Sequence, residues 1–185
     1  MKRLTIIGLA ALLVSVPFAT APGFATTVQK DILAQNVQNQ PKVQLKLTAA
    51  KKIVQKDAQG KDKVTWQSLQ GNVTVKPGDI IRYMVIGANN GDREANNLIV
   101  TQPIPKQTAY VLNSSTTIKS TATVTYSIDN GKTFVAKPTV QVKLANGKVE
   151  TRPAPAEAYT HVRWKFTNAI AAKSIVAAAY QVRVK

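Results

Sequence analysis

The chain has 185 residues, a formal net charge of +16, one histidine and no cysteine. This length suffices for one ordinary domain with its own hydrophobic core. The lack of cysteine excludes disulfides, thiolate metal sites and cysteine nucleophiles, and a single histidine excludes any site that requires two. With 44% hydrophobic residues, the chain is too apolar to be fully disordered.

Residues 1–25 predict a signal peptide. Two basic residues precede an apolar run, 4–16, which suits a secretion signal and is short for a membrane span. Cleavage after Ala25 is favoured over cleavage after Ala21, because Pro22 would follow the second cut. An uncleaved membrane anchor is the alternative. We therefore expect a secreted or periplasmic protein, with the cell surface as a further location and no membrane span after cleavage.

A change of pattern marks the start of the folded domain. Residues 26–42 are rich in glutamine and asparagine and predict a flexible leader. From Val43 onward, apolar and polar residues alternate, as is typical of a strand with one buried face. The charged stretch 51–63 predicts the end of this strand and a loop. Residues 43–185 are the predicted domain.

Further strands are predicted in chain order, separated by turn signals such as Pro77-Gly78-Asp79 and Asn146-Gly147. They span 64–69, 80–86, 98–101, 110–111, 121–128, 133–135, 140–144, 161–166 and 175–184. The spacing of the aromatic residues predicts a core containing Trp66, Tyr83, Tyr126, Phe134, Trp164 and Tyr180. The fold class expected from seven to ten such strands is an all-β antiparallel sandwich of the immunoglobulin-like type.

Several ordered strings are familiar from one bacterial family. They are residues 75–85 with their Pro-Gly-Asp turn, Asn90-Gly91, 95–101, Pro103-Ile104-Pro105, Tyr110-Val111 and 126–131. In this order the chain resembles the domain of unknown function number eleven, an immunoglobulin-like repeat of secreted and cell-surface proteins. The resemblance covers 43–185 and implies an immunoglobulin-like β-sandwich in a surface setting, without catalytic residues. Gln102 departs from the aspartate usual in the family, and Ala171-Ala172 replace a usual glycine.

Catalytic and metal-binding chemistry finds little support in the residues. His161 lies on a predicted strand with no acidic neighbour, and most acidic residues fall in turns and loops, so we expect no enzyme and no cofactor. The asparagine-rich loop with Asp92 and Glu94 supplies oxygen ligands that could suit Ca²⁺. A solvated turn is the favoured interpretation of this loop, and calcium binding is left open.

Positive charge is the remaining functional feature. Signal cleavage removes Lys2 and Arg3 and no acid, which lowers the formal charge from +16 to +14. The densest basic stretch supplies the candidate polyanion contacts, which are Lys51, Lys52, Lys56, Lys61 and Lys63. The alternative is that these lysines serve solubility and protect strand edges.

These features predict a non-catalytic structural, adhesion or interaction module of the cell envelope or surface. Its partners would be other envelope or surface proteins, or anionic polymers. The alternatives are a cationic module for acidic polysaccharide, lipopolysaccharide or extracellular DNA, and a periplasmic assembly factor. Sequence-specific nucleic-acid binding is not expected, because arginine and clustered aromatics are scarce. The oligomeric state is left open.

Overall fold

The computed structural model describes residues 41–71 and 73–185. The predicted signal peptide and most of the predicted leader lie outside these residues. Eleven strands and one short 3₁₀ turn, Ala156–Ala158, occur in the described part of the chain, which is an all-β sandwich-like arrangement of antiparallel sheets. No helix in this part is long and apolar enough to cross a membrane.

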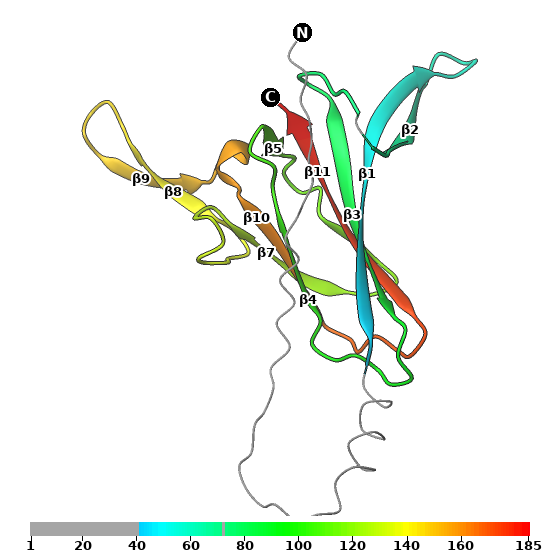
Figure 1. Ribbon diagram of the computed structural model, residues 1–185. Helices are drawn as coiled ribbons and strands as arrows, with labels where there is room; N and C mark the ends of the chain where they lie inside the picture. Colours follow the sequence, from blue (N-terminus) through cyan, green and yellow to red (C-terminus); the bar gives the residue numbers. More distant parts are fainter. Residues whose placement is uncertain (1–40, 72) are drawn as a thin grey trace, which may run out of the picture.

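The strands form two layers and a separate hairpin (Figure 1). The larger sheet has the order β2-β1-β3-β11-β5, with β6 also paired to β11. Its strands are β1 (Val43–Lys56), β2 (Asp62–Leu69), β3 (Ile80–Asn89), β5 (Thr108–Tyr110), β6 (Thr116–Ile118) and β11 (Ile175–Val184). The smaller sheet has the order β4-β10-β7, formed by β4 (Ile99–Pro103), β7 (Ala122–Ser127) and β10 (His161–Phe166). Two strands, β8 (Thr139–Lys143) and β9 (Val149–Pro153), pair only with each other.

Alternating side chains build the core between the two layers. On β3, Ile81, Tyr83 and Val85 are buried, while the residues between them are partly exposed, as the period-two pattern predicts. Trp164 of β10 is fully buried, and its ring centroid lies 5.9 Å from that of Tyr180 on β11. The Tyr180 hydroxyl donates a hydrogen bond of 2.8 Å to the carbonyl oxygen of Pro103 on β4 and so joins the two sheets.

Three sequence predictions about strands were wrong in detail. Eleven strands occur instead of seven to ten, because β5 and β6 are three-residue segments that become strands only by pairing with β11. The predicted strand 133–135 is a single bridge between Tyr126 and Val135. The predicted loop within 51–63 shrinks to five residues, since β1 continues to Lys56 and β2 begins at Asp62.

Two aromatic residues predicted for the core lie outside it. The guanidinium carbon of Arg82 lies 4.2 Å from the ring centroid of Trp66, and that of Arg163 lies 3.4 Å from that of Phe134. Both rings are half-buried beneath an arginine instead of packing between the sheets. The reason is that Trp66 and Arg82 belong to the outer face of the larger sheet, on which no second layer packs within the described residues.

Two hairpins extend beyond the sandwich. Strand β3 pairs with β1 only as far as Lys51, so residues 52–66 form a two-stranded extension, which we call the first arm. The β8–β9 hairpin, residues 139–153, is the second arm. Both arms leave the same end of the sandwich and splay apart, with β1 and β2 on one side and β8 and β9 on the other (Figure 1).

Candidate functional site

A tight turn closes the tip of the first arm. One carboxylate oxygen of Asp57 accepts hydrogen bonds from the backbone N–H groups of Gln59 and Lys61, at 2.9 and 2.8 Å. Gly60 has a φ of +75°, a conformation that glycine adopts without steric cost. This local chemistry explains why the chain reverses at 57–61 and why the two strands of the arm stay in register.

An ion pair fixes the base of the first arm. The ammonium of Lys51 lies 2.7 Å from a carboxylate oxygen of Asp79, and both side chains are partly buried. The same oxygen accepts a hydrogen bond of 2.8 Å from the backbone N–H of Lys76. Burial raises the pKa of Asp79, but the hydrogen bonds and positive charges of Lys51 and Lys76 outweigh it and lower that pKa below its ordinary value.

All five lysines predicted as polyanion contacts belong to the β1–β2 hairpin, but they do not share one face. Lys51 is engaged by Asp79, and Lys56 forms a fully solvated ion pair of 2.6 Å with Asp62. The strand register places Lys52 and Lys56 on one face and Lys51 and Lys63 on the other, with Lys61 in the turn. The cluster is therefore a charged rod instead of a flat patch.

The second arm carries a comparable charge that the sequence reasoning missed. It presents Lys143, Lys148 and Arg152 against Glu150, whose carboxylate pairs with Arg152 at 2.7 Å. Four lysines face two aspartates on residues 52–66, so each arm has a formal net charge of +2. Asn146-Gly147 predicts the hairpin turn of this arm. The return strand Val149–Pro153 was not predicted, because it lacks the alternation of apolar and polar residues.

Neither arm has a core of its own. Val54 and Val64 stand directly opposite each other on the first arm and are 52% and 47% exposed. Strand β9 is exposed along its whole length, including Val149 at 63%. An isolated two-stranded hairpin is at best marginally stable in water. The arms are thus surfaces without an evident structural purpose inside this chain.

A hydrogen-bonded turn lies beside the base of the second arm. The carboxylate of Asp129 accepts hydrogen bonds of 2.6 Å from the hydroxyls of Ser127 and Thr133, which hold its pKa well below the ordinary value. His161 lies next to this turn, edge-on to Phe134. Its pKa is lowered by burial and then by the charge of Arg163, against a smaller opposing effect of Asp129. These contacts account for the conformation of the turn, and none of them indicates a catalytic role for Asp129 or His161.

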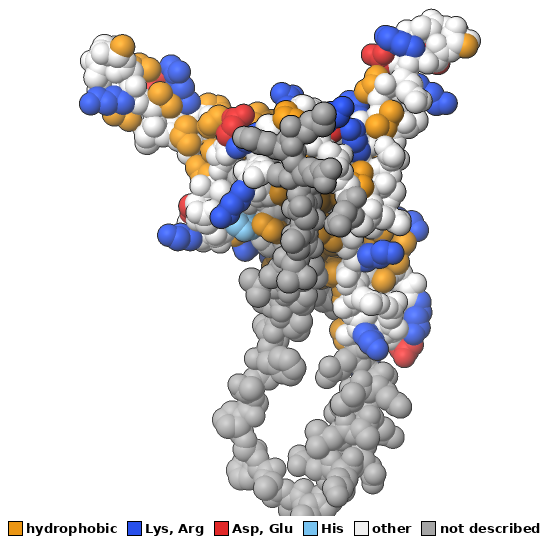
Figure 2. Space-filling view, turned by 45° about the horizontal axis from the view of Figure 1, so that its top comes forward, with side chains coloured by type: hydrophobic (Ala, Val, Ile, Leu, Met, Phe, Trp, Pro, Cys, Tyr) orange, Lys and Arg blue, Asp and Glu red, His pale blue; other side chains and the backbone are white. Residues whose placement is uncertain are grey.

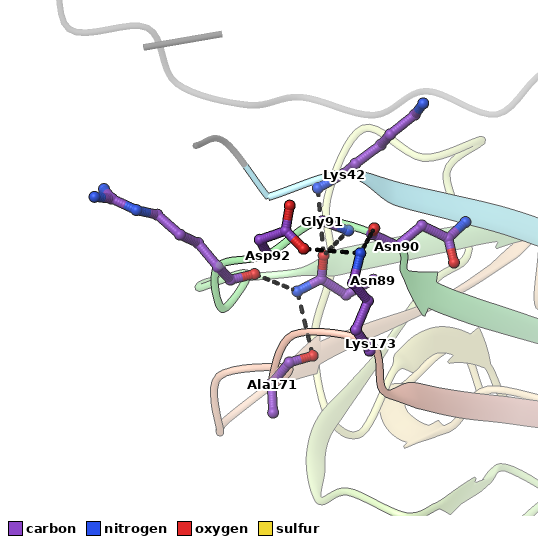
Figure 3. Close-up of polar contacts among 8 residues, drawn as sticks. Lys42, Asn89, Asn90, Gly91, Asp92, Ala171 and Lys173 are labelled. Carbon is purple, nitrogen blue, oxygen red and sulfur yellow. Dashed lines mark hydrogen bonds and ion pairs between the residues drawn. The ribbon is translucent and has the colours of Figure 1, made fainter. Parts of the chain in front are cut away.

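The asparagine-rich loop is organised by a buried amide (Figure 3). The side chain of Asn89 is fully buried, and its nitrogen donates to the carbonyl oxygens of Arg93, Ile170 and Ala171. The ammonium of Lys173 lies 2.8 Å from the carbonyl oxygen of Asn90 and 2.9 Å from a carboxylate oxygen of Asp92. A positive charge of the protein itself therefore lies beside these two oxygens, and calcium binding by the loop stays a prediction.

Glu94, the other acid of that loop, accepts a hydrogen bond from its neighbour Asn96. In residues 41–71 and 73–185, no group of three or more His, Asp or Glu side chains is arranged to hold a metal ion. No family model, curated protein or solved structure matches the chain. The two arms are therefore the candidate functional site, and the assignment depends only on their geometry and charge.

Proposed function

We propose that this protein is an exported, non-catalytic interaction module of the cell envelope or cell surface, and that it makes its contacts through the two arms. The observation that carries the proposal is the pair of core-less hairpins at one end of the sandwich. Projecting hairpins with solvated apolar and basic side chains contribute nothing to the core, whereas they suit contact with a partner.

Shortened arms test this proposal while keeping each turn and its register. One variant deletes 53–56 and 62–65, and a second deletes 140–143 and 149–152; each deletion removes cross-strand pairs of an arm and rejoins the chain through the original turn. The mature protein should sediment with envelope fractions of the producing cell, and the doubly shortened protein should not. Near-UV circular dichroism checks that the sandwich is retained. Equal sedimentation of both proteins would refute the proposal.

An immunoglobulin-like fold related to domain of unknown function number eleven is part of the same proposal. It is supported by where the ordered strings lie. The string 75–85 contains the Gly78 turn and the start of β3, and the string 95–101 leads into β4. The string 126–131 forms the turn around Asp129.

Binding of anionic polymers is the second candidate function, and the matching charge of the two arms favours it. Polyanion binding releases condensed counterions, so its affinity falls steeply as the salt concentration rises. Retention on a heparin column at low salt, lost at moderate salt, is the expected result. Failure to bind at low salt would eliminate this candidate and leave protein contacts as the role of the arms.

A further inference from the structure

A series of backbone contacts crosses the end of the sandwich from which both arms extend. At the first arm, the Asp79 carbonyl accepts a hydrogen bond of 2.9 Å from the backbone N–H of Val184, the last residue of β11. Val184 pairs with Thr108 on β5, and Thr108 bonds back to Pro105. The neighbouring Ile104 donates a hydrogen bond of 2.8 Å to the carbonyl oxygen of Thr160, near the second arm. These contacts join the base of the first arm to the segment that leads from the second arm into β10.

Basic residues also lie at this end of the sandwich, between the arms. Lys76 lies in the turn beside Asp79, and Lys185 follows β11 and donates its backbone N–H to the carbonyl oxygen of Gln107, next to Lys106. Lysine and arginine side chains are visible on both arms and on the surface between them (Figure 2). The carboxylate of Asp79 is already neutralised by Lys51. Lys76, Lys106 and Lys185 therefore add positive charge between the arms, where acidic side chains are also visible (Figure 2).

Resting on the polyanion-binding candidate, we propose that both arms engage one chain of a linear acidic polysaccharide, so that the protein is a bivalent clamp for long polymers. Each arm alone is a weak site, because its charges are solvated and lie on both faces. Two weak sites on one molecule make the second contact intramolecular, which raises the affinity for a ligand that spans both.

The chemistry of the arms favours a polysaccharide over a nucleic acid. Single-stranded nucleic acids are bound by open aromatic faces that stack on bases. The arms contain one aromatic residue, Trp66, and the guanidinium of Arg82 covers one face of its ring. Lysines act as point charges and suit the separate carboxylate or sulfate groups of an acidic polysaccharide. The exposed pair Lys56–Asp62 can exchange its partner for such a group at little cost.

Dependence of the affinity on ligand length distinguishes a clamp from two independent sites. Heparin and heparin-derived oligosaccharides of increasing length are titrated in molar excess, so that each chain carries at most one protein. The wild-type affinity should rise by at least about tenfold between the shortest fragments and full-length heparin, since bivalency contributes gains of about 100-fold or more when geometry permits.

Charge-neutralised variants assign this gain to the arms. Lys52→Gln with Lys63→Gln alters the first arm, and Lys143→Gln with Lys148→Gln alters the second. The matched control, Lys46→Gln with Lys165→Gln, removes the same charge from exposed positions on the body of the sandwich. Neutralising either arm should abolish most of the length-dependent gain and change binding of the shortest fragment by about twofold or less. The control should retain the gain.

Each outcome decides a different point. No heparin binding at low salt would overturn polyanion binding altogether. Binding that is independent of length, or a control as damaging as the arm variants, would overturn the clamp and leave polyanion binding in place. A duplex DNA of matched charge that shows the same length dependence and the same sensitivity to both arms would overturn the assignment to polysaccharide. Melting curves of all three variants confirm that each remains folded.

Discussion

Removal of the Asn89 side chain tests the polar junction at the end of β3. This buried amide accepts hydrogen bonds from the backbone N–H groups of Lys42 and Gly91, at 3.3 and 3.1 Å. Its nitrogen donates to the carbonyl oxygens of Arg93 at 2.6 Å and Ile170 at 3.0 Å. A longer contact of the same nitrogen reaches Ala171 (Figure 3). The Asn89→Ala substitution would remove the partner of the buried N–H of Gly91 and of the carbonyl oxygen of Arg93. It would also remove one of the two hydrogen bonds accepted by the carbonyl oxygen of Ile170, which Ala95 shares.

The expected loss follows from the number of hydrogen bonds. At about 1 kcal/mol for each well-formed hydrogen bond, Asn89→Ala should lower the free energy of unfolding by about 3 kcal/mol. For a domain of this size, such a loss corresponds to a fall of about 10 °C in the melting temperature. Urea denaturation, followed by tryptophan fluorescence, measures the change because Trp164 is buried in the core.

A neighbouring residue supplies the control. Asn90 makes an exposed hydrogen bond to the side chain of Gln44, so Asn90→Ala should cost less than about 0.5 kcal/mol. The Asn89→Asp variant keeps the size of the side chain, but an ionised carboxylate cannot donate hydrogen bonds. Because burial raises the pKa of such a carboxyl, the variant protein should be more stable at acid than at neutral pH. If Asn89→Ala costs no more than Asn90→Ala, the junction is not the stabilising element that its contacts indicate.

Three further predictions concern other contacts, each with its own comparison variant. Tyr180→Phe removes the hydroxyl that joins the two sheets and should cost about 1–2 kcal/mol in urea denaturation, whereas Tyr159→Phe should cost less than about 0.5 kcal/mol. Burial and the charge of Arg163 lower the pKa of His161, so NMR titration should give a value below 6.5 that rises in Arg163→Gln. Because the folded state then resists protonation, stability should fall as the pH drops from above 6.5 through the folded pKa, and His161→Gln should abolish this fall. Lys51→Gln breaks the partly buried ion pair at the base of the first arm and should cost about 1 kcal/mol in urea denaturation. Lys56→Gln breaks a solvated pair and should cost less than about 0.5 kcal/mol; equal losses would refute the role of burial.

Local patterns in the sequence were sufficient for the fold class and for much of the strand arrangement. The alternation in 80–86 predicted which side chains of β3 face the core, and the apolar segment 175–184 predicted the final strand. The turns at Gly78 and Gly147 were predicted because their left-handed backbone conformation favours glycine. All of these features depend on residues within a few positions of one another.

The arms and the polar junction depended on contacts between distant segments. The pairing of β1 with β3 ends at Lys51, because β3 begins at Ile80. Beyond that point β1 pairs only with β2, so most of the charged stretch 51–63 became an extended arm instead of a loop. Asn89 belonged to a predicted polar loop, yet its bonds to Ile170 across 81 positions draw it into the interior. Burial and strand pairing are properties of the assembled sheets, and only the tertiary structure could place two separately encoded basic hairpins at the same end of the sandwich.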